Sequence, residues 1–400
     1  MRSVADLVAE RAAVCEMARR DRMARAWRAY YGEMPRPLRV RPGDPDDNIL
    51  LNFPRLVVDK GVSALFGAEP GLAVGGDARG ERAQAWLDRV WEANRKGALL
   101  HAIGVNGAVC GHAFVRIRPG AAGAGLPRLV NLDPQTVSVF HEADDYEAVT
   151  AYRLEWHGMD PRSGRPCAFR ETIERRRGGP APWSVRTEAS EGDGPWRTAS
   201  EAAWPFAWPP IAGCQNLPAP NELWGVGDLE GDVLAVCSAI NFTLSNMARI
   251  LRFHAHPKTW GSGFSARQLD VAVDGLTILP SPDARLQNLE MQSDLGSSLQ
   301  MYGRLKEALH EIARIPEVAM GRLEGLGALS GTALRILYEP LVEKTRTKRL
   351  LYGELLEDLG RRLLEMGGFG AGARVEVAWP PLGPPGGRDA SGSPREEVAG

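Results

Sequence analysis

The stretch Val226–Phe253, VGDLEGDVLAVCSAINFTLSNMARILRF, decides the fold. Apolar residues recur in it at steps of three and four, which predicts one amphipathic helix about 42 Å long. Asp228 and Asp232 lie in its first turns and Arg249 and Arg252 in its last, the order of charges that a helix dipole favours. The apolar stripe of this helix is formed by Leu229, Val233, Val236, Ile240, Leu244, Met247 and Leu251.

Two further helices follow the first one. The second is predicted over about 297–316, with a serine at its N-cap and a proline that stops it. The third is predicted over about 332–366 and contains Pro340, which should bend it. Residues 320–331 between them hold four glycines, a pattern that is typical of a mobile loop.

An insertion, Thr259–Asp294, separates the first two helices. Gly261 and Gly263 open it, and Pro280 and Pro282 close it. The apolar residues in between alternate on both sides of an Asp-Gly pair, which predicts a short strand or hairpin. They are Val271, Val273, Leu276 and Ile278.

The chain before residue 226 has mixed helix and strand patterns, so we expect an α+β fold. Helices are predicted over 4–31, 55–66 and 78–94. Strands are predicted over 113–118, 128–132, 137–140, 149–156, 169–176 and 184–188. The end of the chain, 384–400, is rich in Gly, Pro, Ser and charge, which is typical of a disordered tail.

The composition limits the classes of function. Apolar residues make up 44% of the chain, enough for a sizeable core, and the net charge is −2. A protein that wraps or reads DNA is expected to carry a basic excess, so we expect DNA contacts to be weak and non-specific. The cysteines are scattered without CxxC spacing, which favours a reduced environment over a zinc site. We expect no signal peptide, because Asp6 and Glu10 interrupt the first residues, and no membrane span, because the most apolar window, 97–117, is too polar.

Candidate catalytic and metal sites are few and weak. Gly325-x-Gly327 lacks the Lys-Ser/Thr pair of a phosphate-binding loop. His254-x-His256 could hold a metal ion, but two histidines that favour the end of a helix dipole are the more common arrangement. The acidic cluster Glu142, Asp144, Asp145 and Glu147 is typical of a solvated turn. We therefore predict no catalytic residue, no cofactor and no metal ligand.

One basic cluster stands out on the third helix, and its role stays open. It consists of Lys344, Arg346, Lys348 and Arg349. A solvated helix face and a face turned to DNA or to a neighbouring subunit are about equally consistent with this pattern.

The chain resembles the portal proteins of tailed double-stranded DNA bacteriophages, or of a related prophage or gene transfer agent. The motifs occur in the same order over about 350 residues. They are Tyr30-Tyr31-Gly32, Asn52–Lys60, Phe66-Gly67, Asn216, Gly225–Leu229, Asn241, Ser330–Leu334, Pro340-Leu341 and Val375–Pro381. Two departures are Gly227, where relatives usually carry a helix-capping Ser, and a short C-terminal part, which leaves no room for a large helical crown.

The resemblance implies a division of the chain into the parts of a portal subunit. The wing would comprise 1–222 and 332–383, the latter with the kinked helix and a closing strand or short crown. The stem helices would be 223–256 and 296–316, the clip 257–295 and the channel loop 317–331, followed by the tail. In the channel loop, the side chains that would narrow the channel are Arg322, Leu323, Glu324, Leu326 and Leu329.

The resemblance also implies the partners and the place of action. Twelve copies would form a ring at the portal vertex of a virion assembled in the host cytoplasm, and genome DNA would pass through its centre. The large terminase subunit, head-completion or adaptor proteins, and the capsid and scaffolding proteins would bind the ring. Part of the apolar stripe should form a seam between neighbouring subunits, because one shorter helix cannot cover it. The alternative is a mixed-fold enzyme that processes nucleic acids, and native size separates the two.

Overall fold

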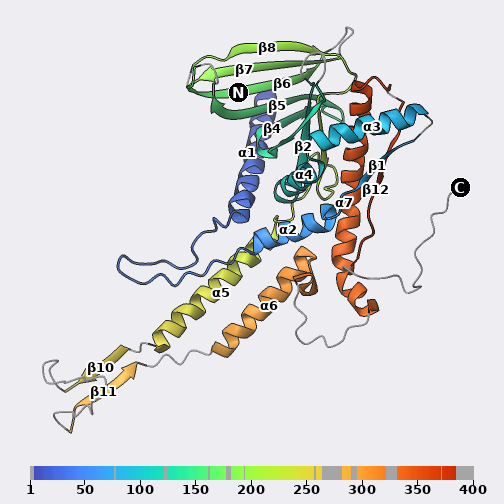
Figure 1. Cartoon of the computed structure of the whole chain (residues 1–400). Helices are drawn as coiled ribbons and strands as arrows, with labels where there is room; N and C mark the ends of the chain where they lie inside the picture. The colour runs from blue at the N-terminus through green and yellow to red at the C-terminus, as the bar shows by residue number, and fades with distance from the viewer. Residues whose placement is uncertain are drawn as a thin grey trace. The chain divides into compact units, whose positions relative to one another are not determined.

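The computed structural model describes residues 4–383 except for short internal segments (Figure 1). These segments are 76–77, 121–124, 161–162, 177–181, 193, 256–257, 264–281, 290–294, 321–330 and 371. The chain divides into two compact units. The first comprises Met1–Tyr31, Phe53–Leu234 and His310–Gly400, and the second comprises Gly32–Asn52 and Ala235–Leu309. The expected α+β class is confirmed.

Among the described residues, five α-helices lie in the first unit. They are α1 (Val4–Tyr30), α2 (Phe53–Phe66), α3 (Ala78–Ala93), α4 (Lys96–Cys110) and α7 (Gly331–Met366). Four of them were predicted within a few residues. Helix α7 contains Pro340, as expected, and its ribbon bends near its start (Figure 1). Helix α4 was not predicted, because its apolar and small residues are buried along most of its length and leave no amphipathic period.

The first unit also contains antiparallel sheets. The strands β2 (His112–Arg118), β3 (Arg128–Leu132) and β9 (Ile211–Gln215) form a sheet in the order β3-β2-β9. A larger sheet has the order β4-β5-β6-β7-β8. Its strands are β4 (Val137–His141), β5 (Val149–Met159), β6 (Pro166–Arg175), β7 (Trp183–Glu191) and β8 (Arg197–Trp204). The closing strand β12 (Val375–Ala378) pairs with β1 (Gly71–Val74).

The core of the first unit lies between helices and the smaller sheet. Leu87 and Val90 of α3 are fully buried, whereas Trp86 is half-buried against the same cluster. One face of the larger sheet packs on a second cluster that includes Ile173 and Trp183. This burial of a single face explains why most of its strands showed an alternating pattern. The edge strand β8 was missed because it exposes nearly all its side chains.

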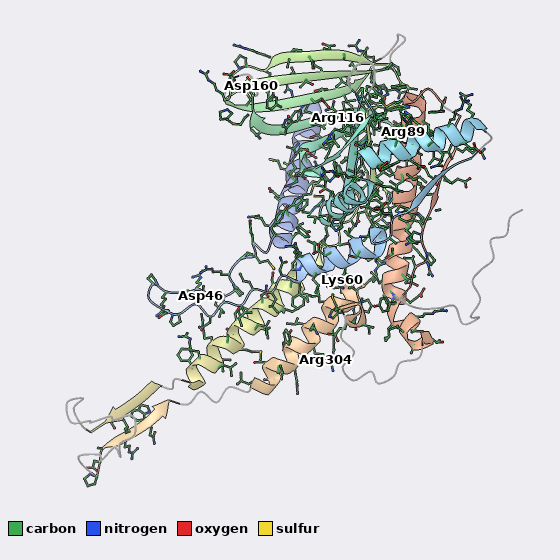
Figure 2. The ribbon with its side chains drawn as sticks, viewed as in Figure 1. Asp46, Lys60, Arg89, Arg116, Asp160 and Arg304 are labelled. Carbon is green, nitrogen blue, oxygen red and sulfur yellow. The ribbon has the colours of Figure 1, made fainter. Side chains whose placement is uncertain are left out.

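A buried ion pair joins the two sheets. Arg116 of β2, labelled in Figure 2, lies 2.5 Å from the carboxylate of Glu171 on β6. Burial raises the pKa of Glu171 and lowers that of Arg116, and the opposite charge of each partner counteracts the shift. The pair therefore acts as an internal connection between the sheets and is closed off from solvent.

The second unit contains two long helices and a hairpin. Helix α5 (Asp232–Ala255) starts in the last residues of the first unit and continues into the second, and α6 is Leu295–Ala313. Between them, β10 (Lys258–Ser262) pairs antiparallel with β11 (Arg285–Leu289). The second helix was expected at this place, and the structure starts it two or three residues earlier than the predicted serine cap.

The predicted start of the first long helix was wrong. Helix α5 begins at Asp232, because backbone N–H groups before it donate hydrogen bonds to residues outside the helix. The N–H of Val226 donates to the carbonyl of Leu217, and that of Asp228 donates to the carbonyl of Ala108. Gly231 has a φ of 61°, a left-handed conformation that separates this turn from the helix. Asp228 therefore does not contribute to the helix dipole.

The buried face of α5 differs from the predicted stripe. Val233 and Ile240 are buried, as expected. Leu229 is also buried but precedes the helix, and Leu251 is 52% exposed. The other three predicted stripe residues, Val236, Leu244 and Met247, are half-buried. Polar Asn241 and Ser245 are buried on α5 together with Cys237, a feature that the apolar pattern concealed.

Asn241 and Ser245 hold an extended segment, 46–52, against α5. The backbone N–H groups of Leu51 and Ile49 donate to the side-chain oxygens of Asn241 and Ser245, both at 2.9 Å. The same two side chains donate back to the carbonyls of Leu51 and Ile49. Because the two residues are one helical turn apart, they match the two-residue period of an extended chain. Asp47 adds an ion pair with Arg252 at 2.6 Å.

We expect Asn241→Ala to loosen this segment. The substitution removes both hydrogen bonds to Leu51, a loss of roughly 0.5–1.5 kcal/mol for the bond from its N–H. Amide hydrogen exchange at Leu51 should accelerate by about tenfold or more. Thr243→Ala is the matched control, because among the described residues its hydroxyl bonds to Ala239 of the same helix alone. Equal exchange of Leu51 in both variants would contradict the assignment.

The hairpin of the second unit lies outside the predicted strand positions. Gly261 belongs to β10, and β11 was not predicted. The predicted hairpin around Asp274-Gly275 lies outside the described residues. Lys258 pairs with Leu289, so the first residue of β10 and the last residue of β11 share one end of the hairpin.

One helix in the described part of the chain is long and apolar enough to span a membrane by length and composition, Asp232–Phe253 within α5. The buried Asn241 and Ser245 bind the segment 46–52, and Arg252 binds Asp47. Because its polar groups have partners within the chain, we interpret α5 as an amphipathic helix that packs on protein.

Candidate functional site

Two residues of the predicted basic cluster point into the protein. Lys344 and Lys348 of α7 are 4% and 2% exposed. Both bind the carboxylate of Asp228, Lys348 at 2.7 Å and Lys344 at 3.3 Å. Asp228 itself is buried. In the subunit, these two lysines therefore lie neither on a solvated helix face nor on a face turned to DNA. The structure corrects both of these interpretations for Lys344 and Lys348.

Further hydrogen bonds extend this buried ion cluster. Asn216 donates to Asp228 at 3.2 Å, and the hydroxyl of Tyr352 donates to Asn216 at 3.2 Å. Lys344 also donates to the carbonyl of Ala313, the last residue of α6, at 3.0 Å. A lysine at this position compensates the negative end of the α6 dipole. The cluster therefore fastens α7 both to the turn before α5 and to the end of α6.

Two glycines make room for the cluster. A Cβ on Gly107 of α4 would lie 1.8 Å from the hydroxyl of Tyr352. A Cβ on Gly61 of α2 would lie 2.9 Å from a carboxylate oxygen of Asp228. The backbones of both helices thus approach the polar side chains more closely than any larger residue permits.

The charges of the cluster are unbalanced, with two ammonium groups against one carboxylate. Burial alone would raise the pKa of Asp228, but the two lysines and the hydrogen bond from Asn216 hold it at about 2. Burial lowers the pKa of Lys348 to about 8, which Asp228 only partly counteracts. The cluster therefore stabilises the ionised form of Asp228 and destabilises the protonated form of Lys348.

The stability of the subunit should depend on pH in two windows. The pKa of Asp228 is lower in the folded state, so its contribution is complete above about pH 4 and is lost as the pH falls toward 2. The pKa of Lys348 is also lower when folded, so unfolding free energy should rise between about pH 8 and 10.5. Urea unfolding across pH measures both effects. Lys348→Met should remove the alkaline rise, and a rise of equal size in that variant would contradict the assignment.

The other two basic residues of the predicted cluster are more accessible. The side chain of Arg346 is 61% exposed and binds Glu339 at 2.9 Å. Arg349 is half-buried, donates to the carbonyl of Pro380 at 2.6 Å and lies over the ring of Trp379. Of the four residues, Arg346 alone has a side chain that is mostly exposed to solvent.

The remaining predicted site residues are only partly described. The channel-loop residues Arg322, Leu323, Glu324, Leu326 and Leu329 lie outside the described residues, as does the His254-x-His256 pair in its side chains. The acidic turn 142–147 is mostly exposed, as expected of a solvated turn. Within the described residues, no group of His, Cys, Asp and Glu could hold a metal ion.

Sequence reasoning missed Asp228 as the partner of the lysines. A signal was present, because Lys348 precedes Tyr352 and Leu355 by one and two helical turns and so lies on the buried stripe of α7. A lysine on a buried stripe requires a carboxylate. The sequence does not show which carboxylate, since Asp228 is 120 residues away.

Comparison with known proteins connects part of this fold to one family. Residues 14–154 match the family model described as phage portal protein, SPP1 Gp6-like. This segment runs from α1 to β5. The expected resemblance to portal proteins is confirmed.

Two solved structures match the chain at low identity. The chain is 14% identical to one from the virion of a native gene transfer agent particle, with a TM-score of 0.44 and 85% of each chain covered. A chain from the neck of a native gene transfer agent particle, computed with C12 symmetry, has the same identity and TM-score, with coverage of 80% of this chain and 79% of that one. No curated protein matches the sequence significantly.

Proposed function

We propose that this chain is a structural portal subunit, which forms a ring at one vertex of a capsid and lets genome DNA pass through its centre. The match of residues 14–154 to the portal family carries the proposal. The order of elements supports it, because a mixed α and β part precedes a long helix, a hairpin, a second long helix and a long helix that contains a proline.

The proposed parts of the subunit follow this order of elements. The wing is 1–222 with 332–383, the stem is 223–256 with 296–316, and the clip is 257–295. The pairing of Lys258 with Leu289 supports the clip assignment, because the strand that follows α5 and the strand that precedes α6 form one hairpin. The proposed channel loop, 317–331, follows α6 in the sequence and precedes most of α7.

The proposed partners are those of a portal vertex. Further copies of the chain complete a ring, with twelve as the proposed number. The large terminase subunit, head-completion or adaptor proteins, and the capsid and scaffolding proteins bind the ring, which is assembled in the host cytoplasm and stays in the virion. The net charge of −2 supports weak DNA contacts, since each neutralised phosphate adds affinity and slows sliding. No observation on the described residues favours the alternative, a nucleic-acid-processing enzyme.

Native size tests the proposed function. A ring of twelve chains of 43.5 kDa has a mass near half a megadalton. Native mass spectrometry of the purified protein should find this closed ring, and negative-stain images should show a central channel. A monomer or small oligomer at every concentration and salt would refute the proposal. Chelators and reductants should leave the ring intact, because the proposed assembly uses neither metal ions nor disulfides.

The clip assignment makes a separate prediction. Replacement of Gly261–Asn288 by a short Gly-Ser linker should abolish stimulation of the packaging ATPase and DNA uptake, because it removes the end of β10 and most of β11, and with them the tip that would meet the motor. Rings should still form, since the stem and wing are unchanged. Survival of DNA uptake in the linker variant would show that the motor docks elsewhere.

A further inference from the structure

The chain leaves the C-terminal end of α6 through a tight turn. The N–H of Arg314, the first residue after the helix, donates to the carbonyl of Glu311 at 3.1 Å. The N–H of Ile315 donates to the carbonyl of His310 at the same distance. Arg314 has a φ of 52°, the left-handed conformation that helix ends usually give to glycine. A residue with a side chain is less stable in that conformation, so the turn depends on the bonds that hold it.

The imidazole of His310 adds a second bond to the same turn. Its Nδ1 lies 2.8 Å from the carbonyl oxygen of Ile315. Because a carbonyl oxygen only accepts hydrogen bonds, Nδ1 carries a hydrogen and donates it. The side chain of His310 is 10% exposed. His310 is therefore joined to Ile315 twice, once through its backbone carbonyl and once through its imidazole, and the second bond fixes the orientation of the imidazole.

The other nitrogen of the imidazole lies near a carboxylate. After Pro316 the chain forms a short 3-10 helix, η3 (Glu317–Met320), and Oε1 of Glu317 lies 3.4 Å from Nε2 of His310. In the described part of the chain, Nε2 is inaccessible to water and has no hydrogen-bond partner. In the neutral imidazole with its hydrogen on Nδ1, Nε2 has a lone pair and no hydrogen to donate to the carboxylate. A proton on Nε2 supplies that hydrogen and makes the contact a charge-assisted one.

Other charged groups also act on the imidazole. Lys344 of α7 donates to the last carbonyl of α6 at 3.0 Å, so its ammonium opposes a second cation at this helix end. Asp228, 3.3 Å from Lys344, partly balances that ammonium. Glu311 and Arg314 have exposed side chains, whose charges water and salt screen. The negative end of the α6 dipole and the carboxylate of Glu317 both favour a protonated imidazole.

We propose that His310 is a pH-dependent link between α6 and η3. When its imidazole is doubly protonated, it donates to the carbonyl of Ile315 and to the carboxylate of Glu317, and η3 is fastened to the end of α6. When the imidazole is neutral, the bond to Ile315 remains and the link to Glu317 is lost. Histidine side chains change their protonation between about pH 5 and 8, so the link forms as the pH falls through this range.

The link would control the position of η3 within one subunit. Tyr338 of α7 also contacts η3, through a bond from its hydroxyl to the carbonyl of Val318 at 3.5 Å, and a tyrosine stays neutral over this pH range. The change with pH therefore falls on the contact between His310 and Glu317. The inference goes beyond the proposed function and does not depend on the assembly of subunits, because every residue in it belongs to the same chain.

Amide hydrogen exchange of the full-length protein tests the link. Exchange is followed by mass spectrometry at about pH 5.5 and about pH 8, and the rates are corrected for the intrinsic effect of pH on exchange. Peptides that cover η3 contain the N–H of Ala319, which donates to the carbonyl of Pro316. They should be protected about threefold more at the lower pH, a modest effect because the side chain of Glu317 is 45% exposed.

Three variants assign the pH dependence to this contact. Glu317→Gln should abolish it, because the amide carries no charge, and a partly exposed side chain can be replaced without unfolding the subunit. His310→Gln should abolish it too, since glutamine does not titrate. His157→Gln is the matched control, because His157 is exposed on β5, and it should keep the wild-type dependence. Equal protection of η3 at both pH values in the wild type, or an unchanged dependence in Glu317→Gln, would overturn the inference.

Discussion

Asparagine in place of Asp228 should destabilise the subunit by roughly 3–5 kcal/mol, because it leaves two buried ammonium groups without a counter-charge. The substitution keeps the size of the side chain, so the loss arises from charge and not from packing. Lys344 and Lys348 are both nearly inaccessible to water and cannot be resolvated without moving α7. Urea unfolding at one fixed protein concentration, followed by circular dichroism, measures the change.

A second substitution separates electrostatics from general damage. Lys348→Met removes the ammonium that burial disfavours and leaves Lys344 paired one-to-one with Asp228. Its own effect should stay within about 1 kcal/mol. Combined with Asp228→Asn, it should restore part of the lost stability, because one uncompensated charge disappears. A double variant less stable than Asp228→Asn alone would show that the cluster acts by packing and not by charge.

The elements that sequence reasoning identified are those with a strong local pattern. Helix α3 buries Leu87 and Val90 and exposes its other side, so its period is visible in the sequence. Strands β2 and β3 were predicted from alternation and a turn between them, and their observed bounds agree closely. Such elements satisfy their backbone hydrogen bonds locally or with a neighbouring strand, and the sequence nearby contains most of the information.

The features that were missed depend on partners far away in the chain. A hydrogen bond from the N–H of Asp228 to the carbonyl of Ala108 holds the turn before α5. Lys344 and Lys348 of α7 bind the carboxylate of Asp228. The local pattern assigned Asp228 to the positive end of a helix dipole. That assignment holds only when no distant partner binds the carboxylate. Likewise, Asn241 and Ser245 resemble ordinary polar positions of α5 until the segment 46–52 is seen against them.

The sequence could predict the family of the protein but not which side chains of the basic cluster are buried. The resemblance to portal proteins is confirmed by the family match, but it could not tell that Lys344 and Lys348 face inward while Arg346 faces solvent. Exposure depends on which side of α7 packs, and the Lys-Arg-rich run spans more than one side of the helix. The predicted seam between subunits depends on burial in the same way. Ile240 was predicted as a seam residue but is fully buried within the subunit.

The seam between neighbouring stems is therefore better tested at exposed positions. In the second unit, Phe242 of α5 is 49% exposed, and Leu299 of α6 is 60% exposed. Large apolar side chains on two long helices are candidates for contact with another copy. An aspartate at Ile240 would unfold the helix packing, and Val236 is half-buried, so a failure of rings in either variant would be ambiguous.

Phe242→Asp and Leu299→Asp should each abolish ring assembly and leave the subunit folded. A charge buried without a partner costs several kcal/mol at every interface, and a closed ring repeats that loss around its circumference. Gln300→Asp is the matched control, because it places the same charge at an exposed polar position of α6. Size-exclusion chromatography with light scattering should show monomers for the two apolar variants and rings for the control. Rings at wild-type yield in Phe242→Asp and in Leu299→Asp would exclude these helices from the seam, whereas a lowered unfolding midpoint would show that the residues stabilise the subunit itself.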